Sequence, residues 1–161
     1  MLARSNVDLD RDPCAIVAMR ELDAPRTLVW QAWSDARHLA QWWGPNGFTL
    51  TTRSFEMREG GVWRFVMHGP DGRDYENRVT FDVIEEPSLI KYHHGGDDDV
   101  EPVQFRTTVT FEDLAGGRTR LTLHAVFPSA EERARVIREY GADKGAEQTL
   151  SRLADYVTTL A

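Results

Sequence analysis

Apolar residues recur at helical spacing in two short segments that begin near residue 25. Val29 and Trp33 lie one turn apart, and this spacing gives a helix an apolar stripe that must be buried. Asp23 and Asp35 each stand where an N-cap is expected, and the Gly-Pro pair at 44–45 is typical of a helix end. We therefore predict two short helices separated by a capped turn.

Elsewhere, apolar and polar positions alternate, as they do in antiparallel strands that are buried on one face. Turns rich in glycine and proline separate the alternating runs. The pattern predicts a sheet of about seven strands. One strand precedes the helices and six follow them, at about residues 14–22, 48–57, 62–68, 75–83, 89–94, 103–111 and 121–127.

Helical spacing returns after the last strand and continues to the C-terminus. Ser129 and Glu132 have the spacing of a capping box, and apolar residues follow at helical intervals up to Leu160. A straight helix of this length would measure about 48 Å, against about 33 Å for a ten-residue strand. We therefore predict a break near Gly141 and Gly145. The order strand, two helices, six strands and one long helix predicts an α+β fold with a mainly antiparallel sheet.

Size and charge narrow the classes of partner. A chain of 161 residues with 41% hydrophobic residues is typical of one domain, and we expect a flexible arm at 1–11 followed by a single domain at 12–161. The formal net charge of -7 disfavours nucleic acids and anionic membranes as partners. Cys14 is the single cysteine, so no internal disulfide can form. With neither a signal peptide nor a long apolar run, we expect a cytoplasmic protein.

Five segments resemble a known family: Asp23-Ala-Pro-Arg, Ala32-Trp-Ser-Asp, His38-Leu-Ala-Gln-Trp-Trp-Gly-Pro, Met67-His-Gly-Pro-Asp-Gly and Phe127-Pro-Ser-Ala-Glu-Glu-Arg. With the order of elements, they are similar to the SRPBCC superfamily, in the branch named after the activator of the heat-shock-protein-90 ATPase. The resemblance covers about residues 14–160. It implies the Bet v 1-like (START-like) helix-grip fold, in which a curved sheet wraps a long C-terminal helix and encloses an apolar cavity. It does not define one chemistry, since the superfamily includes lipid carriers, hormone receptors, polyketide cyclases and co-chaperone modules.

The inward positions of the predicted strands form a candidate ligand-binding set. Each apolar member would serve equally well as plain core. Asn77 and Thr107 are more informative, because an unpaired buried amide costs roughly 1 to 3 kcal/mol and must meet backbone, water or ligand. With Tyr140 from the last helix, the candidates are Trp63, Phe65, Met67, Tyr75, Asn77, Val79, Phe105, Thr107, Leu123 and Tyr140.

Residues that commonly carry chemistry have the wrong pattern for it. His68 and His124 fall on outward strand positions, His38 lies on a helix rich in surface residues, and the adjacent pair at 93–94 must point to opposite faces. The acidic run at 97–99 lacks the spacing of a calcium loop and is typical of a solvated hairpin tip. We expect no metal, no cofactor and no catalytic residue.

The leading hypothesis is a small protein that binds an unidentified hydrophobic or amphipathic molecule in the cavity, oriented by Asn77, Thr107 or Tyr140. One alternative is an interaction module that docks on a chaperone ATPase through an exposed apolar patch. A less favoured one is a cyclase- or hydrolase-type enzyme, for which the inward titratable groups are Tyr75, Tyr140 and Glu147. The sequence leaves open whether two copies form a homodimer.

Overall fold

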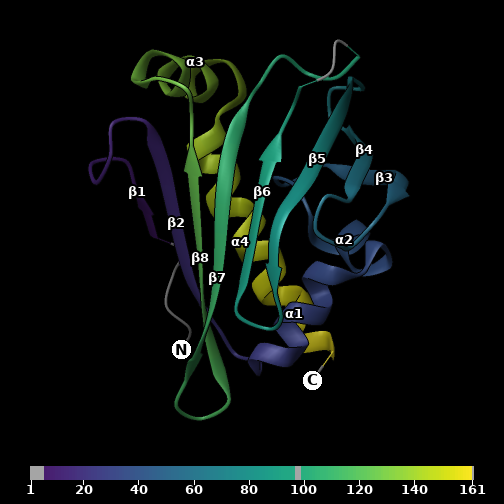
Figure 1. Cartoon of the computed structure of the whole chain (residues 1–161), viewed down its shortest axis with the longest axis vertical. Helices are drawn as coiled ribbons and strands as arrows, with labels where there is room; N and C mark the ends of the chain where they lie inside the picture. Colours follow the sequence, from purple (N-terminus) through teal and green to yellow (C-terminus); the bar gives the residue numbers. More distant parts are fainter. Residues whose placement is uncertain (1–5, 97–98, 161) are drawn as a thin grey trace.

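The fold is one antiparallel sheet that is covered on one face by helices. A computed structural model describes residues 6–96 and 99–160, and Figure 1 shows α4 running behind the sheet with α1 and α2 beside it. Within these residues eight strands are ordered β1-β2-β8-β7-β6-β5-β4-β3. They are β1 (Asn6–Asp8), β2 (Ala15–Leu22), β3 (Thr49–Phe55), β4 (Val62–His68), β5 (Asp74–Glu85), β6 (Leu89–His94), β7 (Phe105–Leu114) and β8 (Arg118–Val126). The helices are α1 (Arg26–Ser34), α2 (Ala36–Trp42), α3 (Ala130–Tyr140) and α4 (Ala142–Leu160).

The predicted α+β class and antiparallel sheet are confirmed, and β4 and β6 have the predicted bounds. The additional strand is β1, which lies in the segment expected to be a flexible arm and pairs with β2 from Asn6↔Met19 to Asp8↔Val17. A strand of three residues is too short to show a period of two. Residues 1–5 of that arm, and residues 97–98 of the predicted acidic turn, lie outside the described residues.

The C-terminal helix breaks at Gly141, as predicted. Gly141 is the C-cap of α3 in the left-handed conformation, with φ of 64°, and its N–H donates to the Ile137 carbonyl. Gly145 is not part of the break and lies within α4. A Cβ atom at Gly145 would lie 3.3 Å from Cγ of Pro45, so this glycine allows α4 to approach the loop that follows α2.

Two of the three predicted caps are present. Asp35 caps α2 by accepting a hydrogen bond from the Arg37 N–H at 2.8 Å, and Ser129 caps α3 by accepting from the Glu132 N–H. The prediction for Asp23 is wrong, because the N-cap of α1 is Pro25 and no side chain caps this helix. Asp23 therefore precedes the first turn by too many residues to reach its free N–H groups.

Replacing Asp35 with alanine is expected to lower the free energy of unfolding by about 1 kcal/mol, the usual value of an N-cap. Arg37 also holds the pKa of the Asp35 carboxyl down at about 2, so the carboxylate is charged near neutral pH. Urea denaturation at pH 7 measures the loss. The matched control is Asp23→Ala, an exposed aspartate that caps nothing, which should change stability by less than about 0.5 kcal/mol. Equal losses in the two variants would contradict the cap assignment.

The hydrophobic core lies between the helices and the covered face of the sheet, in two separate clusters. The larger cluster joins α1, α2 and α4 to the sheet, and its fully buried side chains include Leu22, Val29, Trp42, Phe65, Val79, Ile90, Phe111, Leu121, Leu150, Leu153 and Val157. The smaller cluster lies near α3 and consists of Ile16, Val103, Phe127 and Val136.

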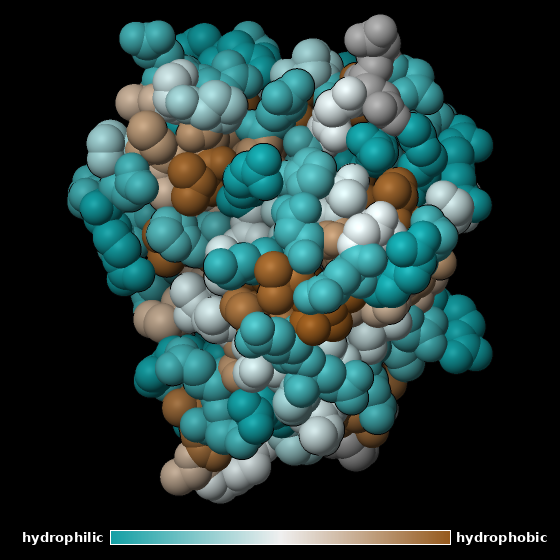
Figure 2. Space-filling model, in the orientation of Figure 1, coloured by the Kyte–Doolittle hydropathy of each residue, from teal (hydrophilic) through white to brown (hydrophobic). Residues whose placement is uncertain are grey.

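The uncovered face of the sheet is mainly hydrophilic. Figure 2 shows apolar side chains on this face only in small, separate groups. Among the described residues, Val126 is the large hydrophobic side chain that is exposed, at 37%. No helix in this part of the chain has the length and apolar character needed to cross a bilayer.

Candidate functional site

A cavity of about 360 Å³, partly open to solvent, lies between the two hydrophobic clusters. Ile16 and Phe127 of the smaller cluster form part of its wall, and Ala18 and Trp33 of the larger cluster form another part. Ala146 of α4 lies on the helical side. The two clusters thus leave room between them instead of closing into one core.

Seven of the ten residues predicted from the sequence line this cavity: Met67, Tyr75, Asn77, Phe105, Thr107, Leu123 and Tyr140. Trp63, Phe65 and Val79 do not. They are at most 2% exposed and belong to the larger cluster. Trp43 from the end of α2 covers this part of the sheet, with its ring centroid 5.0 Å from that of Trp63 and 6.1 Å from that of Phe65. Alternation predicted the correct face of the strands, but not which part of that face stays uncovered.

Sequence reasoning missed several residues of the wall. Trp33 and Trp43 come from the helical region, where no strand pattern points toward a cavity. Tyr92 and His94 come from β6. The signal for these two was present, because they share their parity with Ile90, which is fully buried.

Asn77, Thr107 and Tyr92 are buried polar residues of the cavity wall. Asn77 is 6% exposed, and its Nδ2 donates to the Tyr75 carbonyl at 2.8 Å. Thr107 is 3% exposed and pairs in register with Tyr92 of the neighbouring strand. Burial raises the pKa of Tyr92 to about 12, with the Thr107 hydroxyl acting in the opposite direction. The Tyr92 phenol is therefore uncharged at neutral pH.

His94 is a neutral histidine in the cavity wall. Its ring stacks on Phe105, with centroids 4.8 Å apart and planes 16° apart, and meets the edge of Phe65 at 6.4 Å. Burial lowers its pKa to about 4, because the charged imidazolium would lose its hydration. His94 also lines a second, open hollow of about 320 Å³ that reaches Arg106 and Pro128. The adjacent His93 points to the other face, where its Nδ1 lies 2.9 Å from the Asp82 carboxylate.

Trp33 contributes a hydrogen-bond donor without a partner. The residue is 4% exposed, and among the described residues its indole Nε1 meets no acceptor. Two other indoles are paired: Trp42 Nε1 donates to the Ala32 carbonyl at 3.0 Å, and Trp63 Nε1 donates to Thr52 Oγ1 at 3.1 Å. Leaving a buried N–H unpaired costs roughly 1 to 3 kcal/mol, and the folded protein bears this cost because Trp33 Nε1 has almost no surface open to the cavity.

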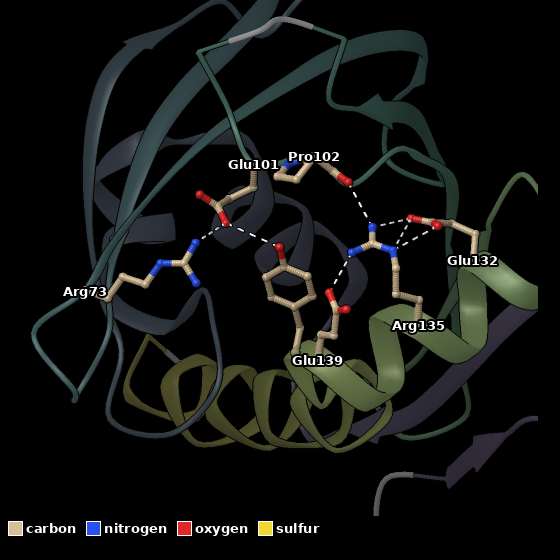
Figure 3. A network of polar contacts seen from close by, with 7 residues as sticks. Arg73, Glu101, Pro102, Glu132, Arg135 and Glu139 are labelled. Atoms are coloured by element: carbon tan, nitrogen blue, oxygen red, sulfur yellow. Dashed lines mark hydrogen bonds and ion pairs between the residues drawn. The ribbon is translucent and has the colours of Figure 1, made fainter.

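Charged residues gather along the loop that follows β6 (Figure 3). The Glu101 carboxylate pairs with Arg73 at 2.7 Å and accepts a longer hydrogen bond from the Tyr140 hydroxyl at 3.4 Å. The Arg73 guanidinium also lies 4.3 Å above the ring of Tyr75. Glu101 thus connects this loop to the turn between β4 and β5 and to the end of α3.

Arg135 ties the same loop to α3 a second time. Its Nη2 donates to the Pro102 carbonyl at 2.9 Å, and its guanidinium pairs with Glu139 at 2.7 Å and with Glu132 (Figure 3). Because Arg73, Glu101, Glu139 and Tyr140 also line the cavity, these ion pairs stand at its edge. The ionic groups of the site therefore surround an interior whose own polar side chains are uncharged.

The cavity wall lacks the further inward carboxylate that the sequence suggested. Glu147, the carboxylate expected to face inward, is exposed on α4 and does not line the cavity. Across residues 6–96 and 99–160, no three or more His, Cys, Asp or Glu side chains come together as metal ligands would. The features on which the site depends are thus a hollow of ligand size, aromatic walls and a few neutral hydrogen-bonding groups.

An antiparallel sheet that grips a long C-terminal helix defines the helix-grip class of α+β domains. Residues 23–158 match the family described as Activator of Hsp90 ATPase homolog 1-like protein, and the chain belongs to that family. No curated protein is similar to this chain in sequence.

Solved structures of bacterial proteins share the fold over nearly the whole chain. A protein of Arthrobacter aurescens is 29% identical, with a TM-score of 0.86, over 96% of this chain and 91% of its own. A protein of Mycobacterium smegmatis is 27% identical, with a TM-score of 0.81, over 99% of this chain and 96% of its own. An AHSA1 protein of Silicibacter pomeroyi is 22% identical, with a TM-score of 0.72, over 91% of this chain and 99% of its own.

Proposed function

We propose that this protein binds a small apolar or amphipathic molecule in the cavity between the sheet and α4. The observation that carries the proposal is the cavity itself. Its volume of about 360 Å³ falls in the range usual for small-molecule sites, and its wall is mostly apolar and aromatic. Unfilled apolar space lowers stability in proportion to its volume. A ligand that fills the space between the two clusters would recover that stability.

The alternative function is docking on a chaperone ATPase, as the family description suggests. The surface of the protein supports it less well. A protein-docking site of that kind needs a contiguous exposed apolar patch. Within residues 6–96 and 99–160, Val126 stands alone as an exposed large hydrophobic side chain, and the face seen in Figure 2 is mainly hydrophilic.

Filling the cavity tests the proposal. Native mass spectrometry of gently purified protein, followed by thermal shift with fatty acids, sterols and aromatic ketones, should identify compounds that bind. Ala125 of β8 lines the cavity, so Ala125→Phe should place a ring in the ligand's space and weaken binding at least tenfold. The matched control is Thr122→Phe on the same strand, since Thr122 does not line the cavity and should leave affinity unchanged.

Two results would contradict the proposal. One is a wild-type protein that carries no bound molecule and is stabilised by no compound of the panel. The other is equal affinity for the same compound in the Ala125→Phe and Thr122→Phe variants, which would place the bound molecule outside the cavity.

A further inference from the structure

Three polar side chains on the uncovered face of the sheet form one chain of hydrogen bonds. The Asp74 carboxylate lies 2.7 Å from His68 Nδ1, and Thr51 Oγ1 lies 2.8 Å from Nε2 of the same ring. The three residues come from β5, β4 and β3, which lie side by side at one edge of the sheet (Figure 1). Met67, the neighbour of His68 in β4, lines the cavity, so His68 points to the opposite face.

The two contacts of His68 assign the direction of each hydrogen bond. A carboxylate can only accept, so Nδ1 carries the ring proton and donates it to Asp74. In the neutral ring Nε2 is then an acceptor, and the Thr51 hydroxyl directs its proton toward it. A hydroxyl held by an imidazole, which a carboxylate orients in turn, is the arrangement that activates a nucleophile.

We propose that Thr51 is the nucleophile of an acyl-transfer site and takes the acyl group from small activated esters. Thr51 Oγ1 forms a bond to the carbonyl carbon of the ester, and the bond from that carbon to the leaving oxygen breaks. His68 Nε2 accepts the Thr51 proton and passes it to the leaving oxygen, so the products are an ester at Thr51 and the free alcohol. His68 is the general base. Asp74 is a positioning residue, because it acts through the imidazole ring.

The surroundings of Thr51 suit a small ester. Thr51 is exposed, and the side chains of His68 and Asp74 are 38% and 63% exposed, so an ester can reach the hydroxyl directly from solvent. Arg53 lies on the same face, where its Nε and Nη2 donate to Glu76 at 3.2 and 2.6 Å. A guanidinium has further N–H groups beyond these two, and a cation here favours the negative charge that develops on the ester oxygen. An aryl ester is the simplest such substrate, because its leaving group departs readily.

Reaction with 4-nitrophenyl acetate at pH 8 tests the proposal in the wild-type protein. Peptide mass spectrometry gives the rate of acetylation at each residue, and hydroxylamine distinguishes a threonine ester, which it cleaves, from an acetylated lysine. Thr51 should be acetylated at least tenfold faster than Thr49, an exposed threonine on the same strand and the same face. In His68→Gln the rate at Thr51 should fall at least tenfold, because the general base is lost.

The variants of the two threonines form a matched pair. Thr51→Val should abolish the ester that hydroxylamine cleaves and the early release of 4-nitrophenol, whereas Thr49→Val should leave both unchanged. Thr51→Ser keeps the hydroxyl and should still form the ester at this position. All three substitutions are at exposed positions, and a thermal unfolding curve shows whether each variant is folded.

Asp74→Asn tests the positioning role with a readout that a purely structural role would not change. Long-range ¹H–¹⁵N spectra should place the ring proton of His68 on Nδ1 in the wild-type protein. In Asp74→Asn the amide can donate to Nδ1, so the proton should move to Nε2 and acetylation of Thr51 should slow.

Equal acetylation of Thr51 and Thr49 in the wild-type protein would overturn the proposal, whatever the variants do. An unchanged rate at Thr51 in His68→Gln would overturn it too, because the hydroxyl would then react without its base. A wild-type ring proton on Nε2 would show that Thr51 has no acceptor in His68. The cavity takes no part in this reaction, so none of these results bears on the proposed binding of a ligand there.

Discussion

Between pH 7 and pH 4, the free energy of unfolding is expected to fall by about 2 to 3 kcal/mol less in a His94→Phe variant than in the wild-type protein. In the unfolded chain a histidine takes up its proton near pH 6.5, whereas burial lowers the pKa of His94 in the folded protein to about 4. As the pH falls through this window, the unfolded state binds a proton that the folded state does not. The free energy of unfolding therefore decreases toward acid, and a shift of this size corresponds to about 2 to 3 kcal/mol.

Phenylalanine keeps the ring that stacks on Phe105 and cannot be protonated, so it removes the acid-dependent loss without emptying the site. Urea denaturation at pH 7 and at pH 4 measures the free energy of unfolding of each protein. The acidic groups are the same in the wild type and the variant, so their pH-dependent contribution cancels in the comparison. An NMR titration of the imidazole signals gives an independent readout, and the His94 signal should move near pH 4. Parallel loss of stability in both proteins, or an imidazole that titrates near pH 6.5, would contradict the lowered pKa of His94.

The sequence predicted the parts of this fold that depend on local periodicity. Strands β4 and β6, the cap at Ser129 and the break at Gly141 each follow from residues close together in the chain. Asp23 shows the limit of such rules, since a capping residue was present and the helix began beyond its reach. β1 shows another limit, because its pairing with β2 is visible only once the two segments are brought together.

The cavity depends on contacts between distant segments, and the sequence could predict it only in part. Alternation placed Asn77 and Thr107 on the covered face, where they line the cavity. It could not show that Trp43 closes the sheet over Trp63, because that contact joins a helix end to a strand twenty residues later. His94 was accessible to the same alternation rule. Because His93 and His94 are adjacent, alternation places them on opposite faces, and this pattern alone did not decide which of the two faces the cavity.

A side chain of α4 fixes the segment that carries Trp43. Arg152 directs its Nη1 to three successive carbonyls, those of Trp43, Gly44 and Pro45, at 3.3, 2.9 and 3.1 Å. Burial lowers the pKa of Arg152 from its usual value, yet an arginine stays charged at neutral pH. Hydrogen bonds from a charged donor are stronger than neutral ones. One guanidinium thus satisfies the backbone that follows α2 and holds one side of the cavity.

Replacing Arg152 with methionine is therefore expected to lower the free energy of unfolding by roughly 3 kcal/mol, because the carbonyls lose a charged donor while the packing of the aliphatic stem is largely kept. Urea denaturation at pH 7 measures the loss. Arg138→Met, at an exposed position in the last turn of α3, is the matched control and should cost less than about 1 kcal/mol.

Hydrogen exchange distinguishes a local role for Arg152 from a general loss of packing. If the guanidinium holds the loop after α2, the Phe48 amide, which donates to the Pro45 carbonyl, should exchange faster in Arg152→Met at pH 7. Amides in the β7–β8 ladder should change only by the global loss of stability. Because Trp43, Gly44 and Pro45 also line the cavity, ligand affinity should fall in the same variant. A variant as stable as Arg138→Met, with unchanged exchange at Phe48, would show that the three carbonyls do not depend on Arg152.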